Sequence, residues 1–157
     1  TFVAHKTAAG WVNVIDEVLI DFSCAAGDGG IALGTTLGKG AATGDGELVV
    51  AEEDGFAVSQ SLLRLRHLPD GGVELARAPR VAPVTSLWGI SSDDLYTARF
   101  SVVERGRGIW TDAGTWEVST VAFEGIAIAR PFYVVRGTRN DNVWLAGESY
   151  VFHKTSP

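Results

Sequence analysis

The chain has 157 residues, a formal net charge of −6 at pH 7 and a single cysteine. This length fits one domain, or one array of small repeats, that can bury a core. One cysteine cannot form a disulfide within the chain or a cysteine-rich zinc site, so disulfide miniproteins and zinc knuckles are excluded. Apolar residues at 46% with charged residues at 20% fit a folded globular protein rather than a disordered one.

The charge balance and hydropathy also narrow the classes of partner. With 19 Asp and Glu residues against 13 Lys and Arg, the chain lacks the excess of clustered cations that nucleic-acid binding requires. No apolar run approaches the roughly 20 residues that a membrane-spanning helix needs. We therefore expect a packed protein that neither binds nucleic acid nor spans a membrane.

Short apolar stretches, interrupted by Gly, Asp, Asn and Ser, predict a succession of β-strands of mostly four to six residues. The predicted strands are, in chain order, Phe2–His5, Trp11–Val14, Glu17–Phe22, Gly30–Thr35, Glu47–Ala51, Phe56–Ser59, Ser61–Arg66, Val73–Leu75, Thr85–Gly89, Leu95–Ala98, Ser101–Glu104, Thr115–Ser119, Gly125–Ala129, Tyr133–Arg136, Val143–Ala146 and Tyr150–His153.

Two stretches have sequences compatible with more than one structure. Ser59 to His67 could pass for a helix, but it alternates leucine with arginine, and a period of two is that of a strand. Gly38 to Gly44 is rich in glycine but lacks the spacing of a phosphate-binding loop, so it is interpreted as a flexible loop.

An internal repeat organises the strands. The segment Ser86 to Val103 aligns without a gap on Val134 to Val151, 48 residues later, with five identities and with Tyr96 opposite Trp144. An offset of 40 residues adds a third copy at Gly46 to Leu63. Since a missed repeat leads to the wrong fold, we expect the repeat to define the architecture.

The alignment is weaker before this third copy. A looser fourth copy covers Phe22 to Gly38, and the interval from Thr36 to Ser61 is too short for a complete four-stranded unit. Either one unit there is incomplete, or the register of the third copy is wrong.

The two ends of the chain resemble each other. Phe2 to Thr7 is FVAHKT and Tyr150 to Thr155 is YVFHKT. Both ends are therefore interpreted as the same strand of a repeating unit. Because a bare edge strand is a template for pairing, we expect self-association, or pairing with another chain, through the terminal edge strands.

A single four-stranded meander cannot bury both of its faces, so its copies must stack. Repeats of about 40 residues with four strands have the period of a β-propeller. We therefore expect an all-β fold, a β-propeller or partial propeller with about four meander blades in one repeat domain. The expected parts are a half blade at 1–14, an irregular blade at 15–45, blades at 46–80 and 81–120, and a blade lacking its last strand at 121–157.

The repeat resembles a known family. LWGISSDDLYTA, at Leu87 to Ala98, resembles bacterial β-propeller repeat proteins with the pattern W-G-x-S-x-x-D-[VL]-[WY]-A-V-G, and Gly137 to Gly147 matches it again. Thr111 to Trp116 is similar to the Asp box of the distantly related sialidase-like propellers. The resemblance implies a structural role for Asp112 and Trp116, and secreted or surface-displayed bacterial proteins mostly without enzymatic activity.

Tryptophan is the best candidate for ligand contact, because its flat ring stacks on sugars and apolar groups. Trp88, Trp116 and Trp144 fall at repeat positions and are expected in the core. Trp110 lies off that register, after an arginine-containing segment. The candidate ligand-binding residues are therefore Trp110, Arg105, Arg107 and Asp112.

No metal or cofactor is expected. His5 and His153 are repeat equivalents, which different blades would hold apart, and His67 borders a hairpin turn. The paired acids at Glu52–Asp54 and Asp93–Asp94 are expected at corresponding turns, which favours a structural role.

These observations favour a non-catalytic scaffold or adhesion module, secreted or at the bacterial cell surface, that binds a protein or glycan partner. A lectin is a subtype of this function. The alternative from another class is a sialidase-lineage glycoside hydrolase. That enzyme requires a cluster of arginines beside a tyrosine at the centre of the ring, and its candidates here are Arg99, Arg130, Arg136, Tyr96, Tyr133 and Tyr150.

Overall fold

The computed structural model describes residues 3–8, 10–15, 36–53, 60–69, 72–80 and 83–154, and these residues form β-strands, turns and loops without a helix. The fifteen strands of the described residues form five antiparallel sheets, none of which closes on itself. The predicted all-β class is therefore confirmed. The predicted strands Glu17–Phe22, Gly30–Thr35 and Phe56–Ser59 lie outside the described residues.

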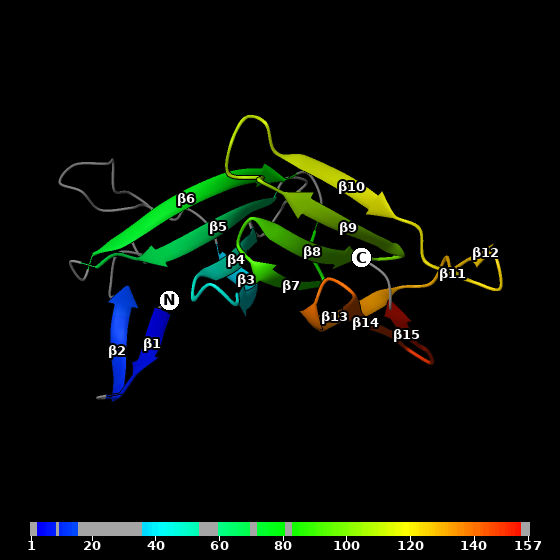
Figure 1. Ribbon diagram of the computed structural model, residues 1–157, viewed down its shortest axis with the longest axis horizontal. Coiled ribbons are helices and arrows are strands. Elements are labelled where there is room, and N and C mark those ends of the chain that lie inside the picture. Colours follow the sequence, from blue (N-terminus) through cyan, green and yellow to red (C-terminus); the bar gives the residue numbers. More distant parts are fainter. Residues whose placement is uncertain are drawn as a thin grey trace.

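Two four-stranded meanders form the centre of the molecule (Figure 1). The first meander sheet runs in the order β3 (Thr36–Ala42), β4 (Leu48–Glu53), β5 (Gln60–His67) and β6 (Val73–Arg80). The second meander sheet runs in the order β7 (Ser86–Ser91), β8 (Asp94–Arg99), β9 (Val102–Arg107) and β10 (Thr115–Ser119). Each strand pairs with its neighbours in the chain, so each sheet is built from consecutive antiparallel hairpins.

The remaining strands form one larger and two smaller sheets. The third meander sheet contains β13 (Phe132–Arg139), β14 (Asn142–Gly147) and β15 (Val151–Lys154). One hairpin pairs β1 (Val3–Thr7) with β2 (Gly10–Ile15), and another pairs β11 (Ala122–Phe123) with β12 (Ile126–Ala127). The β11–β12 hairpin lies in the connection between the second and third meander sheets.

The three meander sheets follow one another with their first strands in contact. β7 contacts both β3 and β13, and Figure 1 shows these strands near the middle of the molecule, with β6 and β10 farther out. Apolar side chains fill the two spaces between the sheets. The cluster between the first and second sheets contains Val49, Ala51, Leu62, Ala78, Val84, Leu87, Leu95 and Ile109. The cluster between the second and third sheets contains Trp88, Tyr96, Ala98, Val103, Phe132, Val135, Val143 and Leu145.

The 48-residue repeat is visible in the strand pairing. Trp88 pairs with Tyr96 across β7 and β8, and 48 residues later Arg136 pairs with Trp144 across β13 and β14. Every β7–β8 pair has such a counterpart, and the register shift that follows Gly89 recurs after Gly137. The second and third meander sheets are therefore copies of one unit at the level of single residues.

The first meander sheet does not follow the predicted 40-residue offset. That alignment makes the segment at Leu48–Glu53 the first strand of a unit, whereas it is the second strand and pairs with β3. The sheet is complete from Thr36 to Arg80, so the boundary predicted at residue 46 is wrong. The error was in the register of the third copy, the second of the two alternatives that the sequence left open.

The glycine-rich stretch Gly38 to Gly44, which the sequence predicts to be a flexible loop, overlaps the last five residues of β3. Gly40 allows this strand to lie close to β4, because a Cβ at this position would lie 3.2 Å from the carbonyl oxygen of Val49 and 3.3 Å from Cγ2 of Val50. The absence of a side chain therefore serves close packing of two strands here.

The bulges at Gly89 and Gly137 provide a test of the shared geometry. A Cβ at either glycine would lie 2.6 Å from a carbonyl oxygen, that of Asp94 or of Asn142. We expect Gly89→Ala and Gly137→Ala each to lower the free energy of unfolding by about 1–3 kcal/mol, measured by urea denaturation. Thr120→Ala, at an exposed position, is the control and should change it by less than about 0.5 kcal/mol. Alanine variants as stable as the unsubstituted chain would contradict the close backbone approach at these two bulges.

Candidate functional site

Equivalent rows of side chains cross the second and third meander sheets. The second-sheet row consists of Trp88 on β7, Tyr96 on β8 and Arg105 on β9. The third-sheet row consists of Arg136 on β13, Trp144 on β14 and His153 on β15. Paired residues of neighbouring strands point to the same side of a sheet, so each row lies on one face.

The second-sheet row belongs to the core. Trp88 and Tyr96 are only 9% and 2% exposed, because the third meander sheet packs over them. Their rings stack with centroids 5.9 Å apart, and the guanidinium carbon of Arg105 lies 5.3 Å from the centroid of the Tyr96 ring. A cation over an aromatic face is stabilised by the ring quadrupole.

Asp94 anchors the charged end of this row. It accepts two hydrogen bonds of 2.7 Å from Arg105 and one of 2.6 Å from the side-chain amide of Asn140. Burial would raise the pKa of the Asp94 carboxyl, but these hydrogen bonds and the charges of Arg105 and Arg107 hold its pKa below the ordinary value of 3.8. Asp94 is thus a structural anion that ties the turn of the third sheet to the second.

The third-sheet row is open to solvent. Trp144 is 46% exposed, and its ring stacks on that of His153 with centroids 3.9 Å apart and an interplanar angle of 8°. Trp144 Nε1 donates a hydrogen bond of 3.2 Å to Asn142 Oδ1, and His153 Nε2 lies 2.7 Å from the same oxygen. The indole is therefore held in one orientation while nearly half of its surface meets water.

A larger apolar face surrounds Trp144. Val134 and Val151 share its side of the sheet and are 40% and 63% exposed, whereas their equivalents Ser86 and Val103 are 4% and 2% exposed. We call this surface the outer face of the third sheet; it consists of Val134, Arg136, Trp144, Ala146, Val151 and His153. It corresponds position by position to the face of the second sheet that the third sheet covers.

One of the three tryptophans expected in the core is not buried. Trp88 is buried, and Trp116 is partly buried and packs against the cluster between the first and second sheets. The prediction is wrong for Trp144, because within the described residues no further sheet follows the third meander sheet and covers its outer face.

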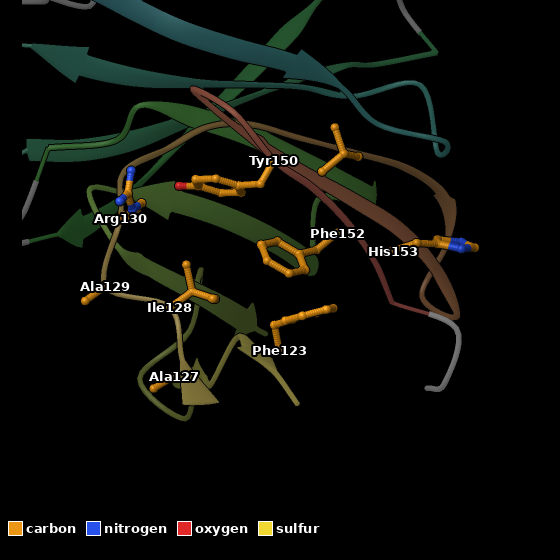
Figure 2. Close-up of a pocket in the computed structure, with 9 residues that line it drawn as sticks. Phe123, Ala127, Ile128, Ala129, Arg130, Tyr150, Phe152 and His153 are labelled. Carbon is orange, nitrogen blue, oxygen red and sulfur yellow. The ribbon is translucent and has the colours of Figure 1, made fainter. Parts of the chain in front are cut away.

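A cavity of about 770 Å³ lies between β15 and the segment that runs from β11 to residue 130 (Figure 2). Its walls are mainly apolar and include Phe123, Ile128 and Phe152. Tyr150 and Arg130 lie toward one end, where the Tyr150 hydroxyl donates a hydrogen bond to the carbonyl oxygen of Pro131. This cavity could accommodate an apolar group, and Arg130 adds a cation at its edge.

A second cavity, of about 310 Å³, lies between the second and third meander sheets. Tyr96 and Val103 line it from the second sheet, and Leu145, Phe152 and Lys154 line it from the third. Both cavities border β15, since Phe152 and His153 line each of them. The packing between the two sheets is thus incomplete beside this strand.

The candidate ligand-binding residue Trp110 is engaged by the fold. Its Nε1 donates a hydrogen bond of 2.8 Å to the carbonyl oxygen of Ser92, and its ring packs against the cluster between the first and second sheets. The guanidinium carbon of Arg64 lies 5.0 Å from the ring centroid. These contacts favour a structural role.

The other three candidates contact different groups. Arg105 pairs with Asp94, whereas Arg107 Nη1 lies 3.2 Å from Glu117 Oε1 in an exposed ion pair. Asp112 lies exposed in the turn before β10. A ligand site made by these residues together with Trp110 stays a prediction, and their contacts lend it no support.

The arginines required by the hydrolase alternative also contact separate partners. Arg99 Nε lies 3.2 Å from Glu104 Oε2, and Arg136 donates hydrogen bonds of 3.1 Å to the Ser86 hydroxyl and the Leu87 carbonyl. Arg130 borders the large cavity. The guanidinium groups of Arg99 and Arg136 therefore contact different groups of the fold.

The acidic pairs do not lie at corresponding turns as predicted. Glu52 lies within β4 and accepts two hydrogen bonds of 2.8 Å from Arg77, whereas Asp94 begins β8. Among the described residues, no group of three or more His, Cys, Asp or Glu side chains could hold a metal ion. The same part of the chain contains no helix long and apolar enough to cross a membrane.

No protein-family model, curated protein or solved structure matches the chain. Function is therefore inferred from the geometry of the third meander sheet.

The lowered pKa of Asp94 predicts a pH-dependent contribution to stability. A carboxyl with a depressed folded-state pKa stabilises the fold above its unfolded value, near 3.8, and this contribution is lost as the pH falls through the folded value. Asp94→Asn should therefore reduce the free energy of unfolding by about 1–3 kcal/mol at pH 7. The deficit should shrink below about pH 4.

Urea denaturation at neutral pH and at about pH 2.5 measures this difference, with Asp112→Asn at an exposed position as the matched control. A deficit for Asp94→Asn that is the same at both pH values would show that the carboxylate charge does not stabilise the fold.

Proposed function

We propose that the chain is part of a β-propeller-like series of meander sheets and acts as a non-catalytic scaffold that binds a protein partner. The series is supported by three consecutive meanders whose first strands lie in contact and whose facing sides share apolar clusters. Such stacking buries faces that one meander cannot bury alone. The resemblance to bacterial repeat proteins supports a secreted or surface location.

The observation that carries the proposal is the exposure of the outer face of the third sheet. The equivalent face of the second sheet is buried, so this face has a side-chain pattern suited to packing against protein. Contiguous exposed apolar surface marks interaction sites, and tryptophan and arginine are enriched among residues that dominate binding energy. Trp144 is oriented before binding by His153 and Asn142, which lowers the entropic cost of contact.

The chemistry around Trp144 favours a protein over a glycan. Val134 and Val151 flank the indole on the same face and would contact apolar side chains of a partner. A glycan would instead need several hydrogen-bonding groups around a stacking ring. The site offers Arg136, Asn142 and His153, and Arg136 Nη1 is already bonded to Ser86 and Leu87. A lectin is therefore the second candidate.

Selection of peptides from a phage-displayed random library tests the proposal. We expect enriched peptides to bind the unsubstituted chain and to bind Trp144→Ala at least about tenfold more weakly, as for truncation of a central binding residue. Val118→Ala is the matched control, because Val118 is also a large exposed apolar residue, on β10, and should retain binding.

Peptides that bind Trp144→Ala as tightly as the unsubstituted chain would contradict the proposal. Glycan-array binding that is lost in Trp144→Ala and retained in Trp110→Ala would establish the lectin instead. Turnover of a fluorogenic sialoside would revive the hydrolase.

A further inference from the structure

The free edge of β15 distinguishes the third meander sheet from the other two. Within the described residues, β15 pairs with β14 alone, whereas its counterparts β5 and β9 each pair with a strand on both sides. A strand with an unpaired row of backbone N–H and C=O groups is a template for another strand. The third sheet thus has room for a fourth strand at this edge.

Strand β2 already pairs with a strand, β1, whose sequence resembles that of β15. β1 and β15 lie in the hexapeptides FVAHKT and YVFHKT, which share valine, histidine, lysine and threonine at the same positions. β1 pairs with β2 along its length. Since β15 repeats most of the sequence of β1, it presents an edge for which β2 is the matching strand.

The register of β2 is that of a fourth strand. Lys6 pairs with Trp11 in the β1–β2 hairpin, and Gly106 pairs with Trp116 in β9 and β10. Lys154 lies 48 residues after Gly106 and corresponds to Lys6 in the shared hexapeptide. Strand β2 beside β15 would therefore place Trp11 opposite Lys154, at the position that Trp116 holds in the second sheet.

The smaller cavity lies where this tryptophan would go. In the second sheet, Trp116 packs against the cluster shared with the first sheet and so closely over Gly106 that a Cβ there would lie 2.7 Å from its ring. Beside β15 the corresponding space is the cavity of about 310 Å³ between the second and third sheets. That volume is roughly twice the ~150 Å³ of an apolar cavity that holds benzene.

A polar group in the same place also lacks a partner. Tyr96 lines this cavity, and its buried hydroxyl has no hydrogen-bond partner among the described residues. An indole N–H is a donor without acceptor capacity, so an incoming tryptophan could satisfy the hydroxyl oxygen.

We propose that β2 of a second copy of this chain pairs with β15 as the fourth strand of the third meander sheet, with Trp11 in the smaller cavity. The strand comes from a second copy because the β1–β2 hairpin and β15 lie toward opposite ends of the molecule (Figure 1). β15 takes the place of β1, and a head-to-tail interface of this kind extends into a ring or a filament. This assembly uses the backbone edge of β15, whereas the proposed partner binds the side chains of the outer face, and His153 adjoins both surfaces.

Disulfide trapping tests the register. By analogy with the His5–Val12 pair of the hairpin, residue 153 of one copy should face residue 12 of the next. The variant Val12→Cys/His153→Cys, made in a Cys24→Ser background, places two thiols at directly opposed positions, whose Cα separation of about 4.5–5.5 Å permits a disulfide. Mild oxidation should give covalent dimers and higher oligomers, with a peptide linking residues 12 and 153.

The matched control is Val12→Cys/Val118→Cys in the same background, because Val118 lies exposed on β10, the edge strand of another sheet. We expect its yield of oligomers to be at least tenfold lower. Equal yields, or a disulfide between residues 12 and 153 within one chain, would overturn the proposal.

Two further variants separate this inference from the proposed function. Trp11→Ser in the trapping variant should reduce the yield of the disulfide at least fivefold, since the cavity would no longer receive an indole. Trp144→Ala in the trapping variant should change the yield by less than twofold. Peptide binding is measured in chains that retain His153, because His153 orients Trp144; there Trp144→Ala should abolish it and Trp11→Ser should leave it intact. If Val12→Cys/His153→Cys gives no trapped oligomers while the chain that retains His153 binds peptide, the strand exchange is refuted and the proposed function stands.

Discussion

A four-stranded meander has two broad faces, and the second meander sheet buries both of them. Leu87 and Leu95 face the first sheet, whereas Trp88 and Tyr96 face the third. Because the hydrophobic effect scales with the apolar area removed from water, the sheets stabilise one another by this sandwich rather than by pairing at their edges. The exposed outer face follows from the same constraint, since within the described residues the third sheet has a neighbouring sheet on only one side.

Much of the fold followed from local patterns, because strand alternation and turn residues act over a few residues. The 48-residue offset was sound since identical residues such as Gly89 and Gly137 mark equivalent bulges. The alignment at an offset of 40 residues was wrong, because it matched residue types but placed β4, a second strand, on β7, a first strand. The sequence did not predict β3, because its glycines are equally typical of a loop. In the structure, Gly40 instead allows β3 to lie close to β4.

The candidate site was less predictable, because burial depends on what lies next to a residue. Trp110 was singled out for its position off the repeat, yet its indole is bound to the Ser92 carbonyl and packs on the core. The sequence predicts Trp144 in the core because its local pattern matches that of Tyr96, but within the described residues no sheet covers the outer face of the third sheet, and Trp144 is exposed.

The difference in burial between the two rows is the central claim, and hydroxyl-radical footprinting read by mass spectrometry tests it with one residue type. Trp88 is 9% exposed and Trp144 is 46% exposed, although they lie on corresponding faces of successive sheets. In dilute solution, Trp144 should be oxidised several times faster than Trp88. Equal rates of oxidation at the two tryptophans would contradict the arrangement in which the third sheet covers Trp88 and leaves Trp144 exposed.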